Sequence, residues 1–203
     1  MSGRPVKRKY DASSRRAAAA ATRDRICAAA EELFVRDGYA RTSLRAVATA
    51  AGVAEATIYL AFPNKGALLD AVILRAVRDN PSEPLDAVAA ASPEQILSRM
   101  AGSNATLMAR AARVIALGES AALMHAELRP LRERAHGNLR AALRVVADRL
   151  DAAGLLRGGA QEAADTMYAI ASESTYLRAG LPPDRYARWL ADTLGAALLR
   201  QSP

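Results

Sequence analysis

Residues 42–65 carry the side chains whose types and spacing point most clearly to a chemistry, which is non-covalent contact rather than catalysis. Two hydroxyl residues open the segment and a short helix follows them. Leu44, Val47 and Ala48 stand at positions i, i+3 and i+4, which is the spacing of a buried helical stripe. Gly52 then supplies the positive φ that a tight turn between two helices needs.

A second short helix is predicted after this turn, with its inner face formed by Ile58 and Phe62, four residues apart. Two short helices joined by a glycine turn predict a helix-turn-helix, a motif whose second helix lies in the major groove of DNA. The side chains left on the outer face are those of Glu55, Ala56, Tyr59 and Leu60, with Thr57 near the helix start.

Three motifs lie in this region: G-Y-x-x-T-S at Gly38 to Ser43, A-x-x-A-G-V at Ala48 to Val53, and T-I-Y-x-x-F-x-N-K at Thr57 to Lys65. Together they closely resemble the DNA-binding region of the TetR family of transcriptional regulators. A lone A-G-V occurs in many alanine-rich helical hairpins, but the full combination is hard to obtain by chance. The alternative interpretation is a helical hairpin that merely packs.

The resemblance implies two kinds of contact between the second helix and DNA. Phosphate contacts fall to Thr57, Tyr59 and Lys65, and base reading to Glu55, Ala56, Leu60 and Ala61. The chain departs from the commoner family pattern near Glu55 and at Leu60 and Ala61, so we expect only modest direct readout of bases. Glu55 is suited to accept a hydrogen bond from a cytosine amino group, and Leu60 to touch a thymine methyl. The alternatives for the Glu55 carboxylate are that it repels unsuitable DNA or that it is a charge which favours the N-terminus of its helix.

Helix ends in this region offer further contacts. Thr42 or Ser43 is placed to cap the first helix, and both hydroxyls would lie near phosphate oxygens if that end faces DNA. Pro63 ends the second helix and Asn64 is placed to cap the next. Lys65 then stands at a helix N-terminus, where a cation opposes the dipole unless an anion such as a DNA phosphate lies nearby.

Composition predicts an all-α fold. The chain has 203 residues, 51% of them apolar, which is ample for a core. Alanine, the best helix former, is abundant, aromatic residues make up 4%, and no stretch alternates as a strand does. We therefore expect a three-helix N-terminal helix-turn-helix domain and a C-terminal helical domain.

Charge is concentrated at the N-terminal end. Residues 1–65 hold 12 Lys+Arg against 6 Asp+Glu, a net charge of +6, while the remainder holds 16 against 15, or +1. Such asymmetry suits a protein whose N-terminal region, residues 1–65, binds a polyanion while the remainder is nearly neutral. The alternative is a solvated basic segment that aids solubility.

Three regions are expected: a basic flexible arm at 1–21, the helix-turn-helix domain at 22–66, and a helical effector-binding and dimerisation domain at 67–203. Arms of this type lie along phosphates or reach the minor groove, or else they add only diffuse electrostatic attraction. Ala17 to Ala21 are suited to extend the first helix backward.

Beyond a loop or interrupted short helix at 81–93, helices are expected near 94–101, 104–118, 121–153, 160–179 and 183–201, with glycines at the breaks. The patterns Y-A-I-A-S-E-S-T-Y from Tyr168 and R-Y-A-R-W-L-A-D-T-L from Arg185 resemble the last two helices of many TetR members, which pair in a four-helix dimer interface. Its expected contacts are Ile170, Leu177, Leu190, Leu194, Ala197 and Leu198; a monomeric core is the alternative.

The resemblance also implies a small-molecule effector pocket in the C-terminal domain. Residues expected to line it are Met100, Asn104, Leu107, Met108, Met124, His125, Met167, Tyr168 and Tyr176; the alternative for each of them is an ordinary place in the core.

No catalytic, metal or cofactor site is predicted. The two histidines, His125 and His136, are expected on one helix about 16 Å apart, too far to share a metal. Cys27 is the only cysteine and is expected to be a small buried residue in a reducing compartment. With no apolar run for a membrane span and no secretory signal, the protein is expected in the cytoplasm.

The sequence thus predicts a homodimeric repressor that a small molecule releases from an inverted-repeat site in double-stranded DNA. A regulator without ligand control, or an activator, is the first alternative. A helical small-molecule-binding or catalytic protein with an incidental basic head, and an architectural protein that coats DNA without sequence preference, are the others.

Overall fold

A computed structural model describes residues 7–79 and 81–200, with side chains described from Ser13 onward. Every regular element in these ranges is helical, apart from an isolated bridge between Leu156 and Leu199. This confirms the predicted all-α class. The chain forms two compact units, and the boundary falls between Arg75 and Ala76. It lies inside a helix and not at residue 66, where the sequence suggested it.

The first unit contains α1 (Lys7–Asp37), α2 (Leu44–Ala51), α3 (Glu55–Ala61) and the larger part of α4 (Lys65–Arg78). Its core gathers one apolar stripe from each helix, as the sequence spacing predicts. The fully buried members of that core include Ile26, Ala30, Phe34, Val47, Ile58, Phe62, Leu68, Leu69 and Val72.

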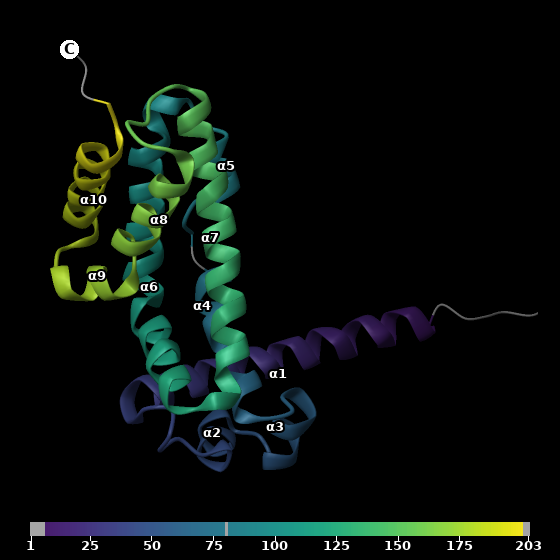
Figure 1. Ribbon diagram of the computed structural model, residues 1–203. Helices are drawn as coiled ribbons and strands as arrows, with labels where there is room; N and C mark the ends of the chain where they lie inside the picture. Colours follow the sequence, from purple (N-terminus) through teal and green to yellow (C-terminus); the bar gives the residue numbers. More distant parts are fainter. Residues whose placement is uncertain (1–6, 80, 201–203) are drawn as a thin grey trace, which may run out of the picture. The chain divides into compact units, whose positions relative to one another are not determined.

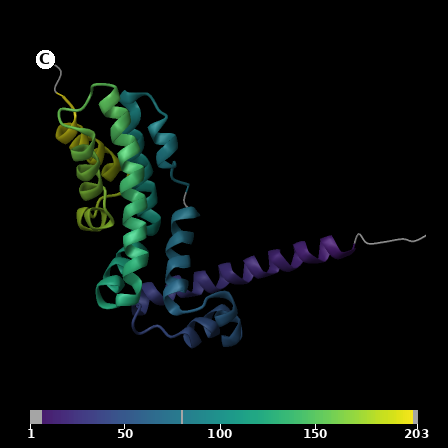
Figure 2. The same cartoon turned by 45° about the vertical axis from the view of Figure 1, so that its right-hand side comes forward.

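Helix α1 is longer than the sequence suggested. Residues 7–21, expected as the main part of a flexible arm, continue α1 toward the N-terminus in both views (Figures 1 and 2). The physical reason is alanine at residues 17–21, because alanine has the highest intrinsic helix propensity. Residues 1–6 of the expected arm lie outside the described residues.

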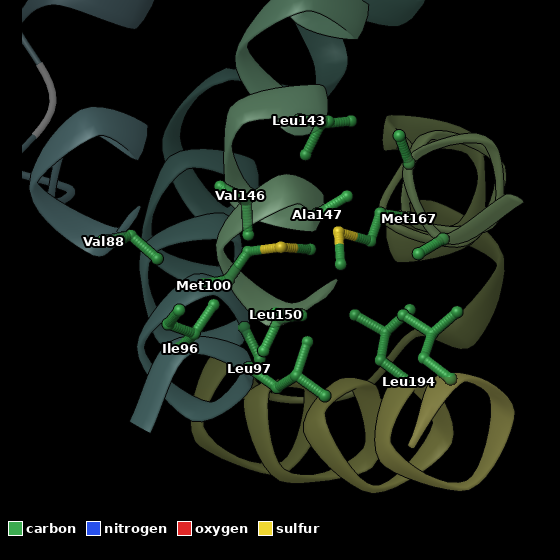
Figure 3. Close-up of a cluster of buried hydrophobic side chains, with 14 of the residues drawn as sticks. Val88, Ile96, Leu97, Met100, Leu143, Val146, Ala147, Leu150, Met167 and Leu194 are labelled. Carbon is green, nitrogen blue, oxygen red and sulfur yellow. The ribbon is translucent and has the colours of Figure 1, made fainter. Parts of the chain in front are cut away.

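The second unit contains α5 (Leu85–Ala89), α6 (Ile96–Met124), α7 (Arg129–Ala152), α8 (Ala160–Ile170), α9 (Glu173–Ala179) and α10 (Pro183–Leu198). Short 3₁₀ turns precede α6 at Pro93–Gln95 and α7 at Ala126–Leu128. Helices α6 and α7 lie side by side, with α8 and α10 packed along them (Figures 1 and 2). Their apolar faces form one core that Figure 3 shows in part.

Several helix boundaries in the second unit differ from those predicted. Helix α6 passes through Gly102 and Gly118 without a break, since a helical glycine costs only about 1 kcal/mol relative to alanine and the buried face of α6 offsets this cost. The predicted helix 121–153 is instead divided at His125, because Pro130 in the first turn of α7 has no amide to continue the ladder. His125 and His136 therefore lie on different elements.

The predicted helix 160–179 is also divided. Ser172 begins a new helix, α9, by accepting a hydrogen bond from the Thr175 amide at 3.2 Å. The last helix, predicted to reach residue 201, ends at Leu198, and the amide of Arg157 then donates to the Leu198 carbonyl at 3.0 Å.

Candidate nucleic-acid interface

Helix α3 has one fully buried face and one open face. Ile58 is 0% and Phe62 1% exposed, whereas Tyr59 is 55% and Leu60 89% exposed. Glu55 and Ala56 are exposed in the first turn and Thr57 is half-buried. The structure thus confirms the outward orientation predicted for this helix. A short helix that keeps large apolar and aromatic side chains in solvent offers them to a partner.

The turn before α3 is set by backbone hydrogen bonds. Gly52 has φ +64°, and the amides of Gly52 and Val53 donate to the carbonyls of Thr49 and Ala48 at 3.2 and 3.0 Å. This confirms the predicted left-handed glycine and fixes the crossing between α2 and α3.

Arg23 of α1 holds the other end of α3. Its guanidinium donates to the carbonyl of Ala61 and lies 4.2 Å from the centroid of the Phe62 ring. A cation at a helix C-terminus also interacts favourably with the helix dipole. Sequence reasoning missed this contact, because 38 residues separate the two partners and no local pattern joins them.

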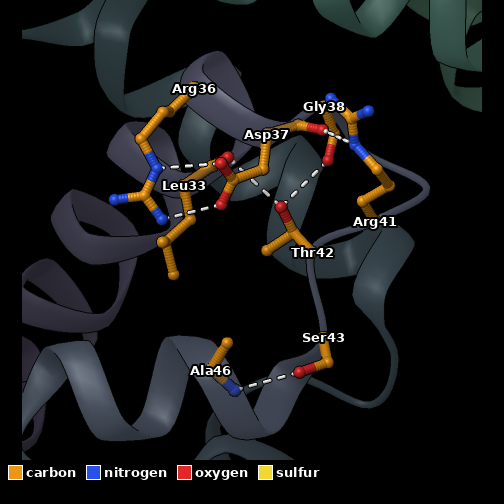
Figure 4. Close-up of polar contacts among 8 residues, drawn as sticks. All are labelled: Leu33, Arg36, Asp37, Gly38, Arg41, Thr42, Ser43 and Ala46. Carbon is orange, nitrogen blue, oxygen red and sulfur yellow. Dashed lines mark hydrogen bonds and ion pairs between the residues drawn. The ribbon is translucent and has the colours of Figure 1, made fainter.

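The hydroxyl pair before α2 divides between core and surface (Figure 4). Thr42 is 3% exposed, and its hydroxyl lies 2.9 Å from the Gly38 carbonyl and 3.2 Å from the Leu33 carbonyl. The predicted phosphate contact of the Thr42 side chain is therefore wrong, since its hydroxyl is buried against the end of α1. Ser43 is exposed and caps α2, accepting from the Ala46 amide at 3.1 Å.

A similar network stiffens the end of α1. Arg36 donates to both carboxylate oxygens of Asp37, at 2.8 and 2.7 Å, which lowers the pKa of Asp37 and raises the pKa of Arg36. The guanidinium of Arg41 donates to the main-chain carbonyl of Asp37 at 2.7 Å (Figure 4). These contacts fix the turn that leads into α2.

Lys65 begins α4 as predicted, and Asn64 caps that helix by accepting from the Ala67 amide at 2.8 Å. The ammonium of Lys65, however, donates to the carbonyls of Tyr39 and Thr42 at 2.8 and 3.1 Å and lies 4.3 Å from the Tyr39 ring centroid. A third carbonyl, that of Ala40, lies at 3.4 Å. In this structure the hydrogen bonds of Lys65 stabilise the turn between α1 and α2. Its contact with a DNA phosphate stays a prediction.

The residues predicted to line an effector pocket do not form one group in the second unit. Met100 and Met167 are buried in the core (Figure 3), while Met124 is 82% exposed at the far end of α6. At 1.5 Å per residue, Met100 and Met124 are about 36 Å apart along the helix. Met124 therefore does not share a site with Met100. Met108 is buried and Asn104, Leu107, His125 and Tyr168 are half-buried.

Asn104 stands out among these residues by its hydrogen bonding. Its Nδ2 donates to the carbonyl of Ala171 at 2.9 Å, at the break between α8 and α9. Its Oδ1 is buried and has no hydrogen-bond partner within the described part of the chain. An unsatisfied buried acceptor costs about 1–3 kcal/mol, so this atom favours a ligand or water that donates to it.

Tyr168 belongs to a polar cluster that the sequence did not predict. Its hydroxyl is hydrogen-bonded to Nδ1 of His136, whose Nε2 lies 2.6 Å from a carboxylate oxygen of Glu119. Arg132 donates to the other oxygen of that carboxylate at 2.5 Å, and the guanidinium of Arg140 lies 3.8 Å from the Tyr168 ring centroid. The cluster ties α6, α7 and α8 together.

Three of the predicted dimer contacts belong to the core of their own chain. Leu190 and Leu194 are 0% and Leu198 4% exposed, because α10 turns this face toward α6. Their prediction as interface residues is therefore wrong. Ile170 and Ala197 are half-buried and Leu177 is 42% exposed, and Trp189 on α10 is 38% exposed.

In the described ranges no single helix is long and apolar enough to cross a bilayer. Only α2 and α3 taken together reach that length and apolar composition, and a bend of 104° separates them.

Residues 26–72 match the family model described as bacterial regulatory proteins, tetR family. The match covers α2 and α3 with the buried part of α1 and most of α4. The predicted resemblance is thereby confirmed. Members of this family are DNA-binding regulators rather than enzymes.

Solved structures with the same fold cover nearly the whole chain. NalD of Pseudomonas aeruginosa, described as the secondary repressor of the MexAB-OprM multidrug efflux pump, is 24% identical, with a TM-score of 0.68 over 89% of this chain and 98% of that chain. A protein described as a transcriptional regulator from Saccharomonospora viridis, in complex with choline, is 20% identical, with a TM-score of 0.70 over 90% of this chain and 100% of that chain. SmeT, in complex with triclosan, is 20% identical, with a TM-score of 0.71 over 90% of this chain and 93% of that chain. The chain therefore has the fold of these transcriptional regulators.

Proposed function

We propose, from the match of residues 26–72 to the family model described as bacterial regulatory proteins, tetR family, that the protein is a homodimeric repressor which a small molecule releases from its operator. One observation carries the DNA-binding part: α3 holds its inner face fully buried while Tyr59 and Leu60 stay in solvent, held at one end by the Gly52 turn and at the other by Arg23. A rigid helix with such an exposed face fits the major groove.

Within this proposal, the exposed side chains of α3 have separate roles. Glu55, Ala56 and Leu60 face base edges, where Leu60 meets a thymine methyl and Glu55 accepts from a cytosine amino group. Thr57 and Tyr59 contact phosphate oxygens and set the position of the helix, and Ser43 at the start of α2 adds a further hydroxyl.

Dimerisation rests on the apolar side chains that remain exposed at the C-terminal end. Leu177 on α9 and Trp189 on α10 are large, apolar and partly in solvent. We assign the dimer contact to these residues, together with the half-buried Ile170 and Ala197. Two identical heads in a symmetric dimer require an inverted repeat whose half-sites lie about one DNA turn apart.

Small-molecule control is supported by two similar structures, which contain choline and triclosan. In this chain the buried, unsatisfied Oδ1 of Asn104 supports binding of a ligand that donates a hydrogen bond to it. We propose repression rather than activation because NalD, which has the same fold, is described as a repressor. The competing function is a regulator, or an activator, without ligand control. We place the protein in the cytoplasm, beside the DNA it regulates.

Selection of duplexes from a random library with the full-length protein tests the proposal. We expect an inverted repeat, bound about a thousandfold or more tighter than random duplex at the same salt concentration. Selected and random duplexes of equal affinity would instead indicate an architectural DNA-coating protein. A reporter gene placed behind the selected repeat then gives the sign of regulation, because a repressor lowers expression and an activator raises it.

A further inference from the structure

We propose that the N-terminal part of α1, residues 13–25, is a second DNA-binding element that contacts the phosphate backbone outside the base pairs facing α3. This inference rests on the proposed function, since it requires that α3 binds DNA. It adds a surface that the base-reading helix does not include. The family match begins at residue 26, so residues 13–25 lie before it.

Packing within the first unit leaves this part of α1 open. From Ser13 to Arg25 no described side chain is buried, and only Thr22 is even half-buried. The buried stripe of the helix begins at Ile26. Both views show α1 extending past the other helices of its unit (Figures 1 and 2). The nearly three helical turns before Arg23, residues 13–22, therefore extend beyond the packed core of the unit.

Charge on this extension is strongly positive and is carried on a stiff support. Residues 13–25 contain four arginines and one aspartate, a net charge of +3, and the five alanines from 17 to 21 favour the helix. The sequence before them adds Lys7, Arg8 and Lys9 against Asp11. A cationic rod with small side chains between its charges complements a regularly spaced row of phosphates.

Arg23 shows that this part of α1 begins next to α3. Because its guanidinium contacts Ala61 and Phe62, α1 passes the carboxyl end of α3 at this residue. Arg16 and Arg15 lie seven and eight residues further toward the N-terminus, hence about 10 and 12 Å along the helix axis. The phosphates of one DNA strand advance by about 3.4 Å along the duplex axis for each base pair. If α1 runs along that axis, the arginines reach about three base pairs beyond the end of α3.

The chemistry of the extension favours phosphate over base edges. A guanidinium offers a planar fork of N–H donors that pairs with phosphate oxygens in two places. The neighbouring alanines carry no group that distinguishes one base from another. The contact should therefore raise affinity and lengthen the footprint without changing the preferred sequence.

The test compares two duplexes that carry the inverted repeat selected by the wild-type protein. One duplex ends at the half-sites, and the other continues for about ten base pairs on each side, one DNA turn. The double variant Arg15→Ala/Arg16→Ala keeps the helix because alanine is a better helix former than arginine. Its matched control is Arg129→Ala/Arg134→Ala, which removes two exposed arginines from α7 of the second unit.

On the long duplex, the slope of log K against log salt should become less steep by about 0.9 for each phosphate contact that the double variant removes. If each of the four arginines in the dimer contacts one phosphate, the total change is about 3.6. On the short duplex, the variant and the wild type should bind alike, and the control should match the wild type on both. Hydroxyl-radical footprinting should show protection outside the half-sites that only the double variant loses.

Two results would overturn the inference while leaving the proposed function intact. Equal slopes for variant and wild type on the long duplex would show that the extension makes no phosphate contact. An equal loss on both duplexes would place the arginines inside the half-site. Failure of the wild type to select any repeat would instead contradict the proposed function itself.

Discussion

Base preference should depend on the two outward side chains of α3 that are neither small nor hydroxylated, Glu55 and Leu60. We expect Glu55→Ala and Leu60→Ala each to shift preference at one or two base pairs per half-site, because each truncation removes a contact to one base edge. Selection from a random library measures the shift. Tyr59→Phe is the matched control: it should weaken binding to all sequences about equally, since a phosphate contact carries no sequence information. Unchanged preference in both alanine variants would remove the base-reading role.

Lys65 makes its observed contacts inside the protein, with the carbonyls of Tyr39 and Thr42 and the ring of Tyr39. Lys65→Met keeps the apolar stem and removes the charge, so we expect the free energy of unfolding to fall by about 1.5–3 kcal/mol, as for other hydrogen bonds to charged groups. Urea unfolding measures this. The salt slope of DNA binding tests the predicted phosphate contact of Lys65 separately, and it should fall by about one per protomer in Lys65→Met. A reduced slope at unchanged stability would assign Lys65 to phosphate alone, and an unchanged slope at reduced stability would assign it to the turn alone.

Tyr186 is fully buried, and its hydroxyl has no hydrogen-bond partner among the described residues. Burial, with a smaller effect of Tyr176, raises the pKa of Tyr186 to about 12. An unfolded chain loses this proton near pH 10. Between about pH 10 and 12 the folded protein thus retains a proton that the unfolded chain has lost, and the free energy of unfolding falls as pH rises.

Tyr186→Phe should remove this alkaline loss together with the unsatisfied hydroxyl. We expect stability equal to wild type or about 1 kcal/mol higher at pH 8, and a decline toward pH 11 that is smaller by about 1.4 kcal/mol. Urea unfolding at the two pH values tests both points, with the exposed Tyr59→Phe as control. A destabilised variant with the full alkaline decline would show that the hydroxyl has a favourable partner.

At the scale of helices, the sequence predicts best what neighbouring residues decide. Gly52 takes the expected positive φ, and Asn64 and Ser43 cap the expected helices, because such turns and caps depend on one side chain and the next few amides. The outer face of α3 was also predictable, since two buried residues four apart determine the rest.

Contacts between distant segments decided the features that the sequence did not predict. Gly102 and Gly118 stay helical because α6 is packed along its length, and Arg23 reaches Ala61 across the fold. Thr42 satisfies the carbonyl of Leu33 and not a surface phosphate. Helix α10 has an apolar stripe that suits either a partner chain or its own core, and periodicity alone does not distinguish the two.

This last point leads to a prediction for α9 and α10. Leu194 is fully buried, so Leu194→Ala should lower the free energy of unfolding by about 2–5 kcal/mol. Leu177 is 42% exposed, so Leu177→Asp should leave the monomer folded and raise the dimer dissociation constant, because it places a charge in the assigned contact. Circular dichroism and sedimentation over a range of concentrations separate the two effects. Tight dimers of Leu177→Asp would exclude this surface.

For the whole molecule, the boundary between the two units lies within α4, so one continuous helix belongs to both. We expect a ligand at Asn104 to lower DNA affinity without touching DNA, because packed helices shift as units and a dimer tolerates little change in half-site spacing. A coupling free energy of about 1–3 kcal/mol corresponds to release by about five- to 150-fold. Replacing Asn104 with leucine should abolish both ligand binding and release while leaving operator affinity unchanged.

Reciprocity makes this coupling measurable from either side. If the ligand weakens operator binding by a given factor, the operator must weaken ligand binding by the same factor. A ligand found by thermal-shift screening of the full-length protein, and bound by wild type but not by Asn104→Leu, provides the probe. Calorimetry should then give a weaker ligand affinity for the operator-bound dimer than for the free dimer, by the factor seen in DNA release. Equal affinities for the two forms would show that this site does not control DNA binding, and the protein would then be a regulator without ligand control at Asn104.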